Sequence, residues 1–135
     1  MGSDPCPTVA LLDHIALATN DVERLRDFYL QLGGVPSGPF TDTDTGLHMW
    51  VLDFSGVRLE LLERSGDGEP DDCDRRAGRL HLGFALGSAD AVDEFCGAIA
   101  AAGYRVLKPP HRVGRVGRYQ SVVLDPDGNH VKLTV

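Results

Sequence analysis

The polarity of residues 9–18 alternates, and this predicts a β-strand whose Ile15 and Leu17 side chains face a core. A helix is expected next, with Asn20 as its N-cap and Glu23 completing a capping box. Its apolar stripe is Val22, Leu25, Phe28, Tyr29 and Leu32. Gly33 and Gly34 end the helix. Two strands are predicted over residues 48–54 and 57–63, and residues 35–40 can supply a shorter one.

The second half of the chain repeats this pattern. Residues 80–86 alternate as a strand, and Ser88 is the expected cap of a second helix that ends at Gly103. The apolar stripe of that helix is Val92, Phe95, Cys96, Ile99 and Ala100. Residues 121–135 predict a strand, a turn with the sequence Asp-Pro-Asp-Gly-Asn, and a last strand.

The two halves align residue by residue. His14 corresponds to His81, Phe28 to Phe95, and the Leu-Asp-x-x-Gly of residues 52–56 recurs at 124–128, so Glu60 corresponds to Lys132. The order strand, helix, strands therefore occurs twice in one α+β fold. A repeat this short cannot bury its sheet face alone, so the two copies must share a core. The expected organisation is a flexible tail (1–7), a first module (8–64), a linker (65–78) and a second module (79–135).

Composition narrows the function classes. The chain has 135 residues, ordinary for one compact unit, and a net charge of −7, which disfavours nucleic acid or an anionic membrane as partner. No signal peptide or membrane-length apolar run is found, and three cysteines without C-x-x-C spacing do not form a disulfide framework or a cysteine zinc site. These features predict a cytoplasmic protein.

The sheet face opposite the helices carries the candidate chemistry. By alternation it presents His14, Arg58, Glu60, His81, His130 and Lys132. A two-fold repeat would bring His14, Glu60, His81 and Lys132 together, and two histidines with one carboxylate can ligate Fe(II), Mn(II), Ni(II) or Zn(II). The alternative is a set of polar residues on a solvated sheet face.

The chain resembles the vicinal oxygen chelate superfamily, which includes glyoxalase I, bleomycin-resistance proteins and extradiol dioxygenases. The resemblance covers about residues 11–135, and the Asp-Pro-Asp-Gly-Asn of residues 125–129 is its most specific motif. The other motifs are Leu-Asp-His-Ile-Ala-Leu (12–17), Asp-Phe-Tyr (27–29), Arg-Leu-Glu-Leu (58–61) and Leu-His-Leu-Gly-Phe (80–84).

The resemblance implies paired βαβββ modules that form a cupped, mostly antiparallel eight-stranded sheet, and it implies homodimers. It also implies a divalent metal held by His14, Glu60 and His81. The fourth ligand position, usually Glu, is Lys132 in this chain.

Lys132 leaves three alternatives open. A protonated lysine about 4 Å from a divalent ion costs roughly 8 kcal/mol at an effective dielectric constant of 20, so Lys132 is expected to point away from a bound metal. In the first alternative, three ligands hold the metal and Lys132 binds an anionic substrate. In the second, no metal binds and Lys132 pairs with Glu60. In the third, Lys132 is a general base, and with Glu60 it is a candidate catalytic residue.

Two further regions are candidates for substrate binding. His48 and Trp50 share one strand face, which is either the wall of the cup or part of the core. Residues 108–118 form a basic, glycine-spaced segment ending in Arg118, which either closes over an anion or is a solvated hairpin connection. With Arg58 and His130, these residues complete the expected substrate contacts.

Two functions from different classes are therefore expected. The first is a metal-dependent lyase, isomerase or thiol transferase acting on a small oxygen-chelating substrate, with Ni, Zn, Mn or Fe(II) as cofactor. The second is a metal-free protein that sequesters a ligand or antibiotic, as the bleomycin-resistance proteins do.

Overall fold

The computed structural model describes residues 10–43, 46–64, 81–115 and 117–135. The predicted tail at 1–7 and the predicted linker at 65–78 lie outside these residues. Within them, no helix is long and apolar enough to cross a membrane.

The predicted order of elements is confirmed, and it occurs twice. The first module contains β1 (His14–Thr19), α1 (Val22–Leu30), β2 (Val35–Thr41), β3 (His48–Phe54) and β4 (Val57–Glu63). The second contains β5 (His81–Ala85), α2 (Ala89–Ala101), β6 (Val106–Val113), β7 (Arg118–Leu124) and β8 (His130–Thr134). The fold is α+β with two βαβββ modules, and residues 35–40, whose pattern was ambiguous, do belong to a strand.

Each module contains one four-stranded sheet with the same topology. The strand orders are β1-β4-β3-β2 and β5-β8-β7-β6, and only the first pair in each sheet is parallel. The parallel register places His14 opposite Arg58 in the first sheet and His81 opposite His130 in the second. The internal repeat therefore puts corresponding polar residues at corresponding places.

The helix caps confirm one prediction and correct another. Ser88 caps α2 by accepting a hydrogen bond from the Ala91 backbone at 3.1 Å. The cap of α1 is Asp21, not Asn20, since the extended Asp21 accepts from the Arg24 backbone at 3.1 Å. The predicted capping box is therefore wrong, and Glu23 reaches His48 on β3 instead.

Each helix covers the sheet face that alternation predicted. Leu17, Leu59 and Leu61 are buried in the first module, and Val131 and Leu133 are fully buried in the second. Burial of these side chains supplies the main favourable term in folding. The polar alternation partners are left on the opposite face of each sheet.

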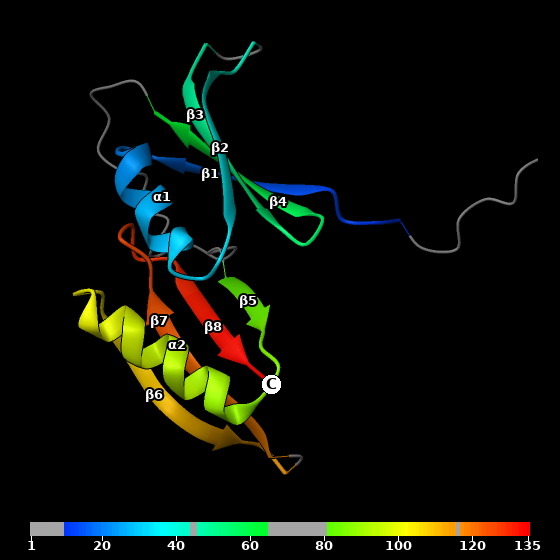
Figure 1. Ribbon diagram of the computed structural model, residues 1–135, viewed down its shortest axis with the longest axis vertical. Helices are drawn as coiled ribbons and strands as arrows, with labels where there is room; N and C mark the ends of the chain where they lie inside the picture. The colour runs from blue at the N-terminus through cyan, green and yellow to red at the C-terminus, as the bar shows by residue number, and fades with distance from the viewer. Residues whose placement is uncertain (1–9, 44–45, 65–80, 116) are drawn as a thin grey trace, which may run out of the picture.

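Aromatic side chains join the two modules at the face that carries α1. Figure 1 shows α1 at the border between the first sheet and the strands of the second module. Phe28 of α1 meets Tyr104 edge to face with a centroid separation of 4.9 Å, and Phe54 meets Phe84 at 5.0 Å. Such pairs add roughly 0.5–1.5 kcal/mol each beyond area burial. One continuous core therefore spans both modules.

A buried hydrogen bond also crosses this border. The Tyr29 hydroxyl donates to Asp125 Oδ2 at 2.7 Å, and both residues are buried. The same carboxylate accepts from the Asp127 backbone, the Asn129 backbone and the Asn129 side chain. The turn at residues 125–129 is thus built around one carboxylate that also anchors α1.

The free energy of unfolding is expected to fall above about pH 10, where an exposed tyrosine ionises. Burial, followed by the nearby Asp125 charge, raises the pKa of the Tyr29 phenol. A raised pKa means that the stabilisation is complete below the ordinary tyrosine pKa and is lost as pH rises, because only the unfolded chain then releases the proton. Urea unfolding at pH 8 and pH 11 measures this loss, and Tyr29→Phe should show a smaller one. Equal losses in the two proteins would contradict the assignment.

Candidate functional site

His14 and Glu60 lie together on the open face of the first sheet. His14 Nε2 is 3.7 Å from Glu60 Oε2, and their side chains are 46% and 25% exposed. Two metal–ligand bonds of about 2.1 Å each span more than this distance, so one divalent ion can contact both atoms. The pair therefore supplies two of the three predicted metal ligands.

Asp13 orients the His14 ring, a role that the sequence did not indicate. His14 Nδ1 lies 2.8 Å from Asp13 Oδ2, and Arg58 donates to the same oxygen at 3.0 Å. The His14 hydrogen bond first, and Arg58 second, hold the pKa of Asp13 below its usual value. We assign the proton to Nδ1, which leaves the Nε2 lone pair directed at Glu60. A carboxylate behind a ligating histidine is a common support of metal sites.

The second module presents the other candidates on the corresponding face. His81 on β5 is exposed, and its ring centroid lies 6.5 Å from that of His130 on β8. Lys132 is partly buried and is paired in register with Gly83. The predicted strand positions of all three residues are therefore correct.

Within the described residues, one chain does not bring the His14–Glu60 pair and the His81–Lys132 face within ligand distance of one another. Among the residues that the structure describes, Glu23, His48 and Glu63 place their ligand atoms close enough to hold one metal ion. None of the predicted ligands belongs to this group. Glu60 pairs with His14, and no ion pair joins Glu60 to Lys132 within the described ranges. Assembly of His14, Glu60, His81 and Lys132 thus needs more than the intrachain repeat.

His48 and Trp50 face α1, so of the two alternatives for this strand face the structure favours the core over the wall of the cup. His48 Nε2 is 2.8 Å from Glu23 Oε1 on α1, and the Arg26 guanidinium stacks 4.6 Å above the Trp50 ring. Leu52, on the same strand face, is fully buried. Trp50 packs against the core, as the alternative interpretation expected.

The basic segment is a hairpin. Residues 106–113 and 118–124 form β6 and β7, and Val113 is paired with Arg118 across the turn. Arg112 donates to the Gly117 carbonyl at 3.1 Å and lies over the Tyr119 ring. Arg118 is exposed at the start of β7. The structure therefore supports the hairpin interpretation.

An apolar cavity of about 680 Å³ lies at the border of the modules. Its lining includes Ile15, Phe54, Leu59, Leu82 and Phe84, all from the helix-covered faces. It has none of the candidate ligands in its lining, so the cavity and the His14–Glu60 pair are separate features.

Comparison with known proteins gives one consistent result. The sequence model of the family described as Glyoxalase/Bleomycin resistance protein/Dioxygenase superfamily matches residues 11–133. The glyoxalase domain-containing protein RDO1 of Mycosarcoma maydis is 26% identical over 129 residues, covering 94% of this chain and 69% of that protein.

Solved structures agree in fold. A glyoxalase/bleomycin resistance protein/dioxygenase family enzyme from Burkholderia phytofirmans PsJN has a TM-score of 0.72 at 21% identity, covering 93% of this chain and 98% of the other. Lactoylglutathione lyase from Agrobacterium tumefaciens has a TM-score of 0.69 at 22% identity, covering 96% and 95%. At this identity the likeness establishes the fold and leaves the reaction to be argued from the site.

Proposed function

This chain belongs to the Glyoxalase/Bleomycin resistance protein/Dioxygenase superfamily, and from that premise we propose that it is a divalent-metal-dependent enzyme. Its substrate would be a small molecule with two adjacent oxygens, and its reaction a lyase, isomerase or thiol-transfer step. The observation that carries the proposal is the His14–Glu60 pair at 3.7 Å, with Asp13 behind the imidazole.

A second copy of the chain would complete the site. The open face of one module carries His14 and Glu60, that of the other carries His81 and Lys132, and the modules of one chain meet through their opposite faces. In a symmetric dimer the first module of one copy can face the second module of the other, which makes two equivalent sites. We therefore propose a homodimer, with His14 and Glu60 from one copy and His81 from the other.

The donor set suits Ni, Zn, Mn or Fe(II), because it offers two imidazoles and one carboxylate. When bound, the metal would polarise the substrate oxygens and favour loss of a neighbouring proton. Asp13 fixes the tautomer and direction of His14, so the imidazole enters the site without reorientation.

The remaining polar residues would position an anionic substrate. Lys132 supplies a positive charge in the place of a fourth acidic ligand, where it would bind a carboxylate or enolate oxygen. His130 is the register neighbour of His81, and Arg58 is that of His14, so both border the same face. Glu60 has a second proposed role: in a state in which its carboxylate does not ligate the metal, it would accept a proton from the substrate.

Metal content tests the proposal. Protein purified without chelator or metal-affinity resin should contain a divalent metal, and His14→Ala should lower the affinity by about 100-fold or more, since one of three protein ligands is lost. Titration calorimetry of the chelator-treated protein with Zn²⁺, Mn²⁺, Ni²⁺ and Fe²⁺ measures this affinity. Ligand binding that is unaffected by EDTA, in a protein that takes up none of these ions, would support a metal-free binding protein instead.

Subunit mixing tests the shared site. His14→Ala and His81→Ala should each be inactive, and a mixture exchanged at low concentration should regain about a quarter of the wild-type sites, because each heterodimer keeps one intact pair of modules. If the mixture regains nothing although heterodimers form, the ligands come from one chain and the dimer arrangement is wrong.

A further inference from the structure

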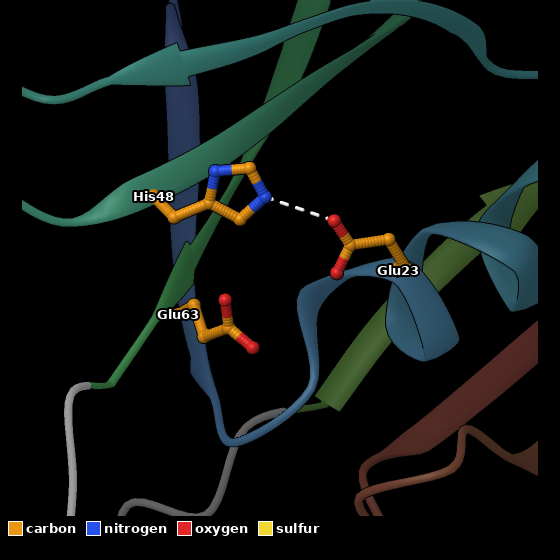
Figure 2. A group of neighbouring side chains, drawn as sticks. All are labelled: Glu23, His48 and Glu63. Carbon is orange, nitrogen blue, oxygen red and sulfur yellow. Dashed lines mark hydrogen bonds and ion pairs between the residues drawn. The ribbon is translucent and has the colours of Figure 1, made fainter.

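A second group of metal-ligating side chains lies on the other face of the first sheet. Glu23, His48 and Glu63 place one ligand atom each within 4.8 Å of one another. Figure 2 shows both carboxylates and the imidazole directed into one common space between α1 and the ends of β3 and β4. Nothing in the family resemblance places a ligand at these positions.

Strand register fixes two of the three side chains. Met49 is paired with Leu62 across β3 and β4, so His48 and Glu63, the next residues outward, lie opposite each other. Both lie on the face that α1 covers, as the buried Leu61 and Leu52 show by alternation. The ligands are thus held on adjacent strands of a sheet rather than on a loop.

The first turn of α1 supplies the third side chain. Glu23 Oε1 lies 2.8 Å from His48 Nε2, and this hydrogen bond is the main cause that lowers the pKa of Glu23. The Trp50 indole nitrogen is buried and has no hydrogen-bond partner within the described ranges. The Glu23 side chain is therefore held beside the imidazole by its hydrogen bond to His48.

Glu63 adds a second carboxylate to the Glu23–His48 pair, and its negative charge is not balanced by a nearby cation in the described part of the chain. It approaches the Glu23–His48 pair and, within the described part of the chain, makes no ion pair of its own. Two carboxylates this close repel each other unless a cation lies between them. The side chains of Glu23 and His48 are 46% and 38% exposed, so an ion from solvent can reach them.

We propose that Glu23, His48 and Glu63 bind one divalent transition-metal ion in a site separate from His14 and Glu60. One imidazole and two carboxylates suit Zn²⁺, Mn²⁺ or Fe²⁺, with water completing the coordination. The ion would connect the first turn of α1 to β3 and β4. It would thereby stabilise the helix whose Tyr29 and Phe28 contact the second module.

Metal titration of a variant that lacks the Glu60 ligand of the other proposed site tests this second metal site. The full chain with Glu60→Gln, freed of metal, is titrated with Zn²⁺ and with Mn²⁺ alone by calorimetry, and the thermal unfolding midpoint is recorded with and without Zn²⁺. We expect one ion per chain and an upward shift of the midpoint. Adding Glu63→Gln should weaken binding by about 10-fold or more and remove the shift, because a charged ligand is lost.

Glu94→Gln is the matched control, since Glu94 is exposed on α2 and the substitution changes the net charge equally. In the Glu60→Gln background it should leave both affinity and midpoint shift unchanged. Circular dichroism without metal checks that each variant is folded. Equal Zn²⁺ affinity with and without Glu63→Gln, or no uptake by the Glu60→Gln protein, would overturn this proposal. If the wild-type protein binds the ion that depends on Glu63 but none that depends on His14, only the proposed function is overturned.

Discussion

Replacing Asp125 with Ala is expected to lower the free energy of unfolding by about 3–4 kcal/mol, a large effect for a single substitution. The Asp125 carboxylate is buried and accepts four hydrogen bonds, from Tyr29, the Asp127 backbone and two groups of Asn129. Without it the Tyr29 hydroxyl is buried with no acceptor, and a buried donor without a partner costs about 1–3 kcal/mol by itself. Urea unfolding at pH 7 measures the loss.

Asp53→Ala is the control, because the internal repeat aligns Asp53 with Asp125. Asp53 accepts one hydrogen bond, from the Gly56 backbone at 3.2 Å, and is exposed. Its replacement should cost less than about 1 kcal/mol. If the two substitutions cost the same, the stabilisation comes from the shared turn and not from the contact of Asp125 with α1.

This pair of aspartates shows what the sequence could and could not predict. Hydrophobic alternation, the two helical stripes and the repeated Leu-Asp-x-x-Gly predicted the order of elements correctly. They also predicted the buried helix faces, except that Ala100 of the α2 stripe is exposed. The repeat did not indicate that one aspartate is buried and the other exposed. That difference arises because the Asp125 carboxylate contacts Tyr29 of the other module, whereas the Asp53 side chain is exposed and accepts from the Gly56 backbone in its own turn.

The face of His48 and Trp50 was not predictable for a local reason. β3 has apolar residues on both faces, since Met49 is buried as well as Leu52. The alternation of its sequence therefore does not show which face is turned toward the helix. The true face follows only from pairing with β4, where Leu61 and Leu59 lie beneath α1. The same pairing brings Glu63 opposite His48, and spacing along the sequence gives no sign of that.

Two features could not be predicted from the sequence, for different reasons. They are the N-cap residue of α1 and the way in which the predicted ligands come together. Asn20 and Asp21 are both good capping residues, and the choice depends on where β1 ends. The sequence placed His14, Glu60, His81 and Lys132 on the correct strand faces. It could not show which modules face each other, because that depends on contacts such as Phe54 with Phe84.

Lys132→Glu is expected to raise the affinity of the His14-containing site for a divalent metal by about 100-fold or more. On the proposed dimer, Lys132 is the counterpart of Glu60, so a glutamate there completes two imidazoles and two carboxylates. Each unit-charge pair at 4 Å is worth roughly 4 kcal/mol at an effective dielectric constant of 20. Reversing one charge beside a divalent ion thus far exceeds the roughly 2.7 kcal/mol that a 100-fold change requires, even when solvent weakens the interaction.

Two comparisons separate this electrostatic effect from others. Lys132→Ala removes the positive charge without adding a ligand, so it should leave the metal affinity equal or higher while changing the turnover of an anionic substrate. Arg115→Glu makes the same change in net charge at the exposed tip of the β6–β7 hairpin and should leave the affinity unchanged. If Lys132→Glu behaves like Arg115→Glu in metal titrations, Lys132 does not face the ion. The charge difference between the repeats would then have to be explained by another contact of Lys132, and the proposed pairing of modules would have to be abandoned.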